Sequence, residues 1–170
     1  MRGQKLCLGR TSLLCDRAHV VARNGRPDMI YHAQCACGAV KMEADGEPLV
    51  QCYCHCNSCR SRTGSPVSAP VLWPRPKIRF VSGEDKLRRY SKNNHPEGGV
   101  LTCGVCNGLV GVYLADAGLF DIFAGLFSDL KFTPTVHLNY ENAVLPIKDG
   151  LPKLKDMPAD WGGSGEFMVE

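Results

Sequence analysis

The sequence has no long apolar run, and it carries little net charge outside its first segment. A membrane-spanning helix needs about eighteen or more apolar residues in a row, so we do not expect this chain to be a membrane protein. The net charge of the 170 residues is +3, but residues 1–28 hold six Lys or Arg against Asp16 and Asp28, which leaves a nearly neutral remainder. A nearly neutral protein has no basic patch to attract nucleic acid, so we expect no nucleic-acid partner.

The chain also lacks any stretch of about twelve or more residues with the periodicity and caps of a helix. Instead it has short runs rich in β-branched and aromatic residues, separated by Gly, Pro and Asn. These runs are MIYHAQC, AVKMEA, PVLW, KIRFV, KLRRYS, GVLTC, LVGVYL, LFDIFAG and TVHLNY. A length of 170 residues suits one domain with a real core. We therefore predict a single, mainly β domain over residues 29–145.

The two ends of the chain differ from this β-rich part. Residues 1–28 are basic and poor in acidic residues, and we expect a disordered extension; an organelle transit peptide has the same composition and is the alternative. The apolar runs in this segment are too short for a secretory signal, so we expect a cytoplasmic protein. Its cysteines, Cys7 and Cys15, are isolated and are assigned no chemistry. Residues 146–170 are rich in Pro and Gly, and we expect a tail that wraps the surface or frays.

Ten cysteines are the strongest feature of the sequence. Without a secretory signal the thiols should stay reduced, and disulfides between cysteines two positions apart are strained. Clustered cysteines therefore favour metal binding over a disulfide framework. The motifs CAC and CGVC each offer two thiolates from a tight turn, and together they supply the four that a closed tetrahedral zinc site needs. The sequence predicts a structural zinc at Cys35, Cys37, Cys103 and Cys106.

The stretch QCYCHCNSCR predicts a second, open site. Sulfur atoms on one tetrahedral zinc lie about 3.8 Å apart, whereas alternate side chains of a strand lie about 6.6 Å apart. Adjacent cysteines can lean together, but Cys52 and Cys56 could share an ion only across a sharp bend. Cys56 and Cys59 form a C-x-x-C turn, so the compact trio is Cys54, Cys56 and Cys59. Three thiolates leave one position open, which is typical of a zinc ion with a chemical role.

Four residues beside this trio have alternative interpretations. Cys52 is interpreted as a buried apolar filler, with a reserve ligand as the alternative. His55 would point away from its neighbours in a regular strand, so we interpret it as a packing or hydrogen-bonding residue. Arg60 and Arg62 are either solvated surface cations or groups that hold the carboxylates of an acidic thiol beside the metal.

The successive motifs CACG, CHCNSCRSRTG, VSGEDKLRRY and CGVCNGLVG resemble those of the GFA-domain family. This family is named for glutathione-dependent formaldehyde-activating enzyme and also contains centromere protein V. The resemblance covers about residues 31–140. It implies a zinc-stabilised β domain of several coiled antiparallel sheets, with one structural and one exchangeable zinc on the two cysteine sets derived above. Asn107, in place of the usual Gly, and the additional Cys52 depart from the family pattern.

The resemblance implies addition of the glutathione thiol to formaldehyde, giving S-(hydroxymethyl)glutathione, which is a carbon–sulfur lyase reaction in reverse. A zinc ion with three thiolates polarises a carbonyl poorly and prefers a fourth soft ligand. We therefore expect capture of a small thiol such as glutathione at the trio, beside Arg60 or Arg62, followed by attack on a small aldehyde. The alternative is a non-catalytic zinc-stabilised β module that binds a partner or a small thiol, because no acid–base pair is recognisable from the sequence. Methionine sulfoxide reduction fits less well, because such enzymes bind zinc through two C-x-x-C pairs.

Overall fold

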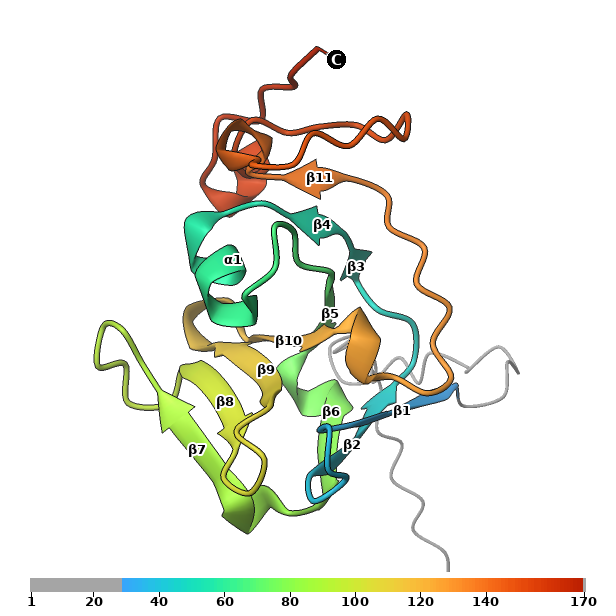
Figure 1. The fold of residues 1–170 in the computed structure, drawn as a ribbon, viewed down its shortest axis with the longest axis vertical. Coiled ribbons are helices and arrows are strands. Elements are labelled where there is room, and N and C mark those ends of the chain that lie inside the picture. Colours follow the sequence, from blue (N-terminus) through green and yellow to red (C-terminus); the bar gives the residue numbers. More distant parts are fainter. Residues whose placement is uncertain (1–28, 170) are drawn as a thin grey trace, which may run out of the picture.

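The structure is a computed structural model, and it describes residues 29–169. Within this range it contains three β-sheets, one α-helix and several 3-10 turns (Figure 1). The expectations for residues 1–28, the isolated thiols Cys7 and Cys15 among them, lie outside the described residues. Each of the β-rich runs quoted above coincides with one strand of the structure to within a few residues, which confirms the mainly β class.

The largest sheet has the strand order β3-β5-β10-β9-β8-β7 and is antiparallel. Its strands are β3 (Val50–Gln51), β5 (Pro70–Pro74), β7 (Leu87–Tyr90), β8 (Gly99–Cys103), β9 (Leu109–Leu114) and β10 (Leu119–Phe123). Successive side chains of a strand point to opposite faces. On β10, Phe120 and Ile122 therefore enter the main core, while Asp121 between them lines a cavity on the other face.

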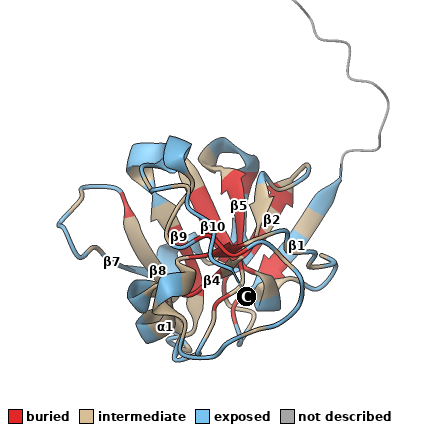
Figure 2. Cartoon of the chain, turned by 90° about the horizontal axis from the view of Figure 1, so that it is seen from above, coloured by how far each residue is buried: buried red, intermediate tan, exposed pale blue. Residues whose placement is uncertain are grey.

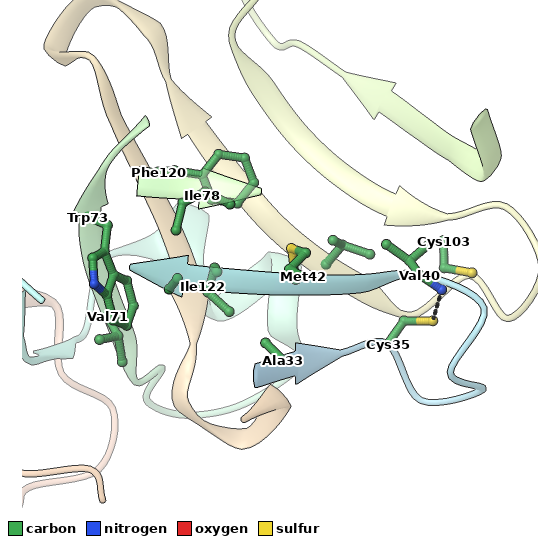
Figure 3. Packing of buried hydrophobic residues seen from close by; sticks show 12 residues of the cluster. Ala33, Cys35, Val40, Met42, Val71, Trp73, Ile78, Cys103, Phe120 and Ile122 are labelled. Atoms are coloured by element: carbon green, nitrogen blue, oxygen red, sulfur yellow. Dashed lines mark hydrogen bonds between the residues drawn. The ribbon is translucent and has the colours of Figure 1, made fainter. Parts of the chain in front are cut away.

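Two smaller sheets complete the fold. The antiparallel sheet β1-β2-β6 contains β1 (Ile30–Gln34), β2 (Lys41–Asp45) and β6 (Ile78–Ser82). The third sheet is the parallel pair of β4 (Tyr53–Cys54) and β11 (His137–Leu138). The main core joins the largest sheet to the β1-β2-β6 sheet. Met42 of β2 packs in one cluster with Trp73 of β5 and Phe120 of β10 (Figures 2 and 3). Apolar side chains on facing strands thus hold the two sheets together.

The helix α1 (Asn57–Thr63) was not predicted from the sequence. Seven residues are too few for helical periodicity to be recognised, and the caps define this helix instead. The sulfur of Cys56 accepts the backbone N–H of Cys59 at the amino end. Gly64, at φ 65°, ends the helix and donates its N–H to the carbonyl of Arg60. The 3-10 turns are η1 (Arg75–Lys77), η2 (Glu84–Lys86), η3 (Ala115–Ala117), η4 (Ala124–Leu126), η5 (Tyr140–Asn142) and η6 (Ala159–Trp161).

The chain after β11 folds back alongside β11, on the side away from β4 (Figure 1). The N–H of His137 donates to the carbonyl of Pro152, and the N–H of Leu154 donates to the carbonyl of His137, each at 2.9 Å. Leu154 is buried in a second, smaller core with Cys52 and Cys54. This part of the tail therefore packs directly behind the cysteine-rich segment. None of the helices in residues 29–169 has the length and apolar character that crossing a bilayer requires.

A partly buried polar network links this tail to β4 and β11. The ring nitrogens His55 Nε2 and His137 Nδ1 are 2.9 Å apart, and His137 Nε2 lies 2.9 Å from Asp149 Oδ2. Lys153 Nζ donates to the other carboxylate oxygen at 3.2 Å. The carboxylate only accepts, so His137 donates to Asp149 from Nε2. His55 is fully buried and is thus a hydrogen-bonding residue, as its direction in the strand predicted.

This network predicts an acid-sensitive contribution to stability. Desolvation opposes the shift, but hydrogen bonds from His137, the N–H of Leu151 and Lys153 lower the pKa of Asp149 to about 2. An unfolded Asp has a pKa of about 3.9, so this stabilisation is complete above that pH and is lost as the pH falls through about 2. We expect Asp149→Asn to lower the free energy of unfolding at pH 7 by about 1.5–3 kcal/mol in urea titrations.

The exposed Asp85, substituted in the same way, serves as the control and should change stability little. Any loss of metal in acid would affect both variants and the wild type alike. The quantity compared is therefore the difference in the free energy of unfolding between the wild type and each variant. The difference between wild type and Asp149→Asn should shrink as the pH is lowered below 4. A constant difference down to pH 2.5 would contradict the assignment of this stabilisation to the Asp149 carboxylate.

Candidate functional site

The four cysteines predicted to form the closed site lie together. The sulfur atoms of Cys35, Cys37, Cys103 and Cys106 are all within 4.8 Å of one another. The Cys35 and Cys37 sulfurs are 3.6 Å apart, and those of Cys37 and Cys103 are 3.9 Å apart. Figure 3 shows Cys35 and Cys103 beside each other at one end of the main core. These separations match the value of about 3.8 Å expected for thiolates on one tetrahedral zinc.

The turn between β1 and β2 presents the first two of these cysteines. The N–H of Cys35 donates to the carbonyl of Val40 at 3.0 Å, and the N–H of Val40 donates to the Cys35 sulfur at 3.3 Å (Figure 3). Gly38 takes a φ of 71°, which closes the turn without a steric penalty. Burial opposes the shift, but the Val40 N–H and the thiols of Cys103 and Cys37 lower the pKa of Cys35 to about 6. The turn therefore favours the thiolate form at Cys35. At Cys37 the backbone N–H of Ala39 opposes the shift, but the thiols of Cys106, Cys35 and Cys103 raise the pKa.

The turn between β8 and β9 presents the other two cysteines of this group, Cys103 and Cys106. The N–H of Val105 donates to the Cys103 sulfur at 3.4 Å, and the N–H of Cys103 donates to the carbonyl of Gly108 at 2.9 Å. Asn107 occupies the left-handed region at φ 58° and donates its N–H to the carbonyl of Cys103. Asparagine tolerates this conformation better than most residues other than glycine. The turn thus keeps its shape although Asn107 departs from the family pattern.

The second group consists of Cys54, Cys56 and Cys59, whose sulfurs also lie within 4.8 Å of one another. Cys54 ends β4, where its backbone exchanges two hydrogen bonds with Ser68, at 2.9 and 3.1 Å. Cys56 caps α1, and the first turn of this helix brings Cys59 back towards both of the others. Asn139 approaches Cys54 from the opposite side, with 3.8 Å between its Nδ2 and the sulfur. The helix therefore supplies the bend that a continuous strand could not.

The three thiols interact electrostatically. Hydrogen bonds from the thiols of Cys54 and Cys59 and from the Cys59 N–H lower the pKa of Cys56. The same contact with Cys56, a contact with Cys59 and burial raise the pKa of Cys54. These interactions favour the thiolate at Cys56, and repulsion between thiolates disfavours ionisation of Cys54. A divalent cation would relieve this repulsion, because thiolates are the form of cysteine that binds metal.

Both groups fit metal ions. All eight cysteines in residues 29–169 are free thiols, so disulfides do not compete for the seven sulfurs of the two groups. Four sulfurs in the first group complete a tetrahedron, and three in the second leave one position for another ligand. Soft thiolate donors in these numbers are consistent with zinc.

The trio opens onto a large cavity. Its volume is about 1610 Å³, which exceeds the roughly 300–1,000 Å³ of typical small-molecule pockets. The trio and Arg62 of α1 line one wall. Other walls come from the loop between β7 and β8, from the connection of β9 to β10 and from η6. The cavity has room for a tripeptide together with a second small reactant.

The structure separates the two arginines of α1. Arg62 lines the cavity that holds the trio. Arg60 does not line this cavity; its Nε donates to the carbonyl of His55 at 3.0 Å, and its guanidinium also contacts the side chain of Asn57. Arg60 therefore supports the start of the helix, and Arg62 is the arginine placed beside the trio.

Cys52 lies close to the trio but is not part of the metal group. Its side chain is fully buried, and its sulfur lies 3.9 Å from the carbonyl of Pro70. Burial, followed by the charges of Asp121 and Cys59, raises the pKa of Cys52, which disfavours the thiolate. These features match a buried filler rather than a ligand.

Asp121 is a cavity residue that the sequence analysis missed. Its side chain is buried at 7% exposure, and its Oδ1 has no hydrogen-bond partner among the described residues. Burial raises the pKa of Asp121 to about 7; the charge of Arg62 opposes the shift, and that of Cys56 adds to it. The signal in the sequence was the single charged residue inside the apolar run LFDIFAG. A charge inside a buried strand is unusual and marks a position worth testing.

Comparison with known proteins adds a family match. The family model described as glutathione-dependent formaldehyde-activating enzyme matches residues 30–142, which is more than half of the chain. Among solved structures, a crystal structure of a Rhodobacter sphaeroides protein is similar at 20% sequence identity and a TM-score of 0.48. That similarity covers 61% of this chain and 91% of the other. No curated protein matches the chain.

Proposed function

Because the chain belongs to the glutathione-dependent formaldehyde-activating enzyme family, we propose that it is a zinc-dependent carbon–sulfur lyase acting on adducts of glutathione with a small aldehyde. With formaldehyde the adduct is S-(hydroxymethyl)glutathione, and the enzyme would form and cleave its carbon–sulfur bond. The observation that carries the proposal is the open trio of thiols at the wall of a large cavity. A cytoplasmic location, where glutathione and reduced thiols prevail, is part of the proposal.

Two zinc ions per chain are proposed, one for each cysteine group. The group of Cys35, Cys37, Cys103 and Cys106 would hold a structural ion, because its four sulfurs leave no position for a substrate. The trio would hold the other ion and leave its fourth position to the substrate thiol. Zinc bound there would lower the pKa of that thiol, so that the nucleophilic thiolate exists at neutral pH.

The residues around the trio would bind and orient the substrate. Glutathione carries two carboxylates, and Arg62 can receive one of them in a charge-assisted, bidentate contact. The cavity is large enough to hold the tripeptide and the aldehyde together, which would replace a chance encounter by an oriented approach. Leu72 and Val112 lend apolar surface to this cavity.

The proposal is tested by turnover, because the uncatalysed addition of thiols to aldehydes is already easy. We expect the zinc-loaded protein to accelerate exchange between free formaldehyde, glutathione and their adduct, measured by magnetisation-transfer NMR at equilibrium. Calorimetry on the same sample should detect glutathione binding. Binding without acceleration would favour the non-catalytic zinc module instead. Absence of both would contradict a thiol site at the trio.

The two arginines provide a matched pair for substrate binding. We expect Arg62→Ala to weaken glutathione binding about ten- to one hundred-fold, because a hydrogen bond to a charged group contributes about 1.5–3 kcal/mol. Arg60→Ala should act mainly on thermal stability, because Arg60 contacts His55 and Asn57 rather than the cavity. Calorimetric Kd values and melting curves of both variants separate these effects. An equal loss of affinity in the two variants would contradict the assignment of the carboxylate contact to Arg62.

A further inference from the structure

Asp121 occupies the middle of the largest sheet. It lies on β10, where it is opposite Leu72 of β5 and Val112 of β9. Its neighbours Phe120 and Ile122 belong to the main core on the other face. Asp121 therefore shares its face with Leu72 and with the cavity that the trio lines. Its backbone is held on both sides by strand pairing, so the side chain has a defined position.

The Asp121 carboxyl has no evident structural task. Its Oδ1 is enclosed and without a hydrogen-bond partner within residues 29–169. A buried polar atom left in this state costs about 1–3 kcal/mol, and the opposite residues on the neighbouring strands are apolar. A valine or leucine at this position would avoid that cost. A buried, unpartnered carboxyl directed into a cavity instead indicates a role towards a ligand.

Metal binding is not that role. The sulfur atoms of Cys54, Cys56 and Cys59 lie within 4.8 Å of one another, and the carboxylate oxygens of Asp121 lie outside this group. The fourth position at the trio thus remains available to a thiol. The charged groups that act on Asp121 are Arg62 and Cys56, both from the wall that carries the trio. Asp121 therefore faces the place where the proposed thiol and aldehyde would meet.

We propose that Asp121 is the residue that transfers the proton in the lyase reaction, and this inference rests on the proposed function. In the direction of adduct formation, the Asp121 carboxylate accepts the proton of the incoming thiol. The thiolate electron pair then forms the carbon–sulfur bond, and the carbonyl π pair moves onto the aldehyde oxygen. That oxygen takes the proton from Asp121, which returns to the carboxylate. Thiol and aldehyde give the adduct with no other reactant, and cleavage follows the same steps in reverse.

The first test is Asp121→Asn in the zinc-loaded protein. The amide keeps the shape of the side chain but cannot transfer the proton, and such transfer contributes about 10²- to 10⁴-fold to a rate. We expect formaldehyde exchange, measured by NMR as above, to slow at least one hundred-fold. Zinc content and glutathione affinity should remain those of the wild type. The exposed Asp85, changed to Asn, is the control for loss of a carboxylate elsewhere.

A second variant separates proton transfer from packing. Asp121→Ala leaves space for a small carboxylic acid, so added formate should restore a measurable part of the exchange rate in a concentration-dependent way. A packing role would not respond to formate. The inference is overturned if Asp121→Asn keeps the wild-type rate, if it loses zinc together with activity, or if formate fails to restore the alanine variant. A wild type that does not accelerate exchange would overturn the proposed function as well, whereas the other outcomes leave that function intact.

Discussion

Replacement of Cys56 by serine is expected to reduce zinc from two ions to one per chain and to return formaldehyde exchange to the uncatalysed rate. Cys56 lies in the middle of the trio and is also the amino-terminal cap of α1. Serine is a preferred cap, so the helix should survive the change. Its neutral hydroxyl is, however, a poor substitute for a soft thiolate ligand. The variant therefore removes the metal site while it preserves the local fold.

The measurements for this prediction are zinc per chain by elemental analysis, exchange rate by NMR and melting temperature. The matched control is Cys52→Ser, a neighbouring buried thiol outside the metal group. Its serine hydroxyl can still donate to the carbonyl of Pro70, so two zinc ions should remain. A Cys56→Ser protein that retains two zinc ions or wild-type exchange would contradict the assignment of the trio.

The second large effect is expected at the four-cysteine group, where Cys103→Ser should leave the protein largely unfolded at 37 °C. The Cys103 and Cys37 sulfurs are 3.9 Å apart although 66 positions separate the residues in the chain. A metal ion held by this group would join the β1–β2 turn to the end of β8. Structural zinc sites in small domains bind with about 10–16 kcal/mol, whereas a whole domain is stable by about 5–15 kcal/mol. The free energy lost with this site can therefore exceed the net stability of the whole domain.

Far-UV circular dichroism and urea titration of Cys103→Ser check this prediction, with Cys52→Ser as the control for serine at a buried cysteine. A chelator added to the wild type should reproduce the unfolding, and added zinc should reverse it. A cooperative urea transition for Cys103→Ser within 1 kcal/mol of the wild type would show that the main core, rather than the metal, holds the two turns together.

Several features of the protein followed from the sequence because they are local. The β-rich runs between Gly, Pro and Asn became strands, since period-two side-chain patterns and turn residues act over a few positions. The partition of seven cysteines into two groups also followed from spacing, because the reach of neighbouring side chains limits which sulfurs can share an ion. The helix α1 was missed, because seven residues defined by Cys56 and Gly64 leave no periodic signal.

The tertiary structure alone decided which polar residues meet the cavity. Arg60 and Arg62 are the same residue type two positions apart, so the sequence does not distinguish their roles. Only the orientation of α1 places Arg62, and not Arg60, at the cavity that the trio lines. Asp121 is buried between β5 and β9, and the pairing of β5 with β10 joins distant parts of the chain. The His55–His137 contact likewise spans 82 positions. Such contacts arise from sheet pairing and core packing, which local spacing does not encode. The sequence by itself therefore determined the two cysteine groups, while the fold determined what surrounds them.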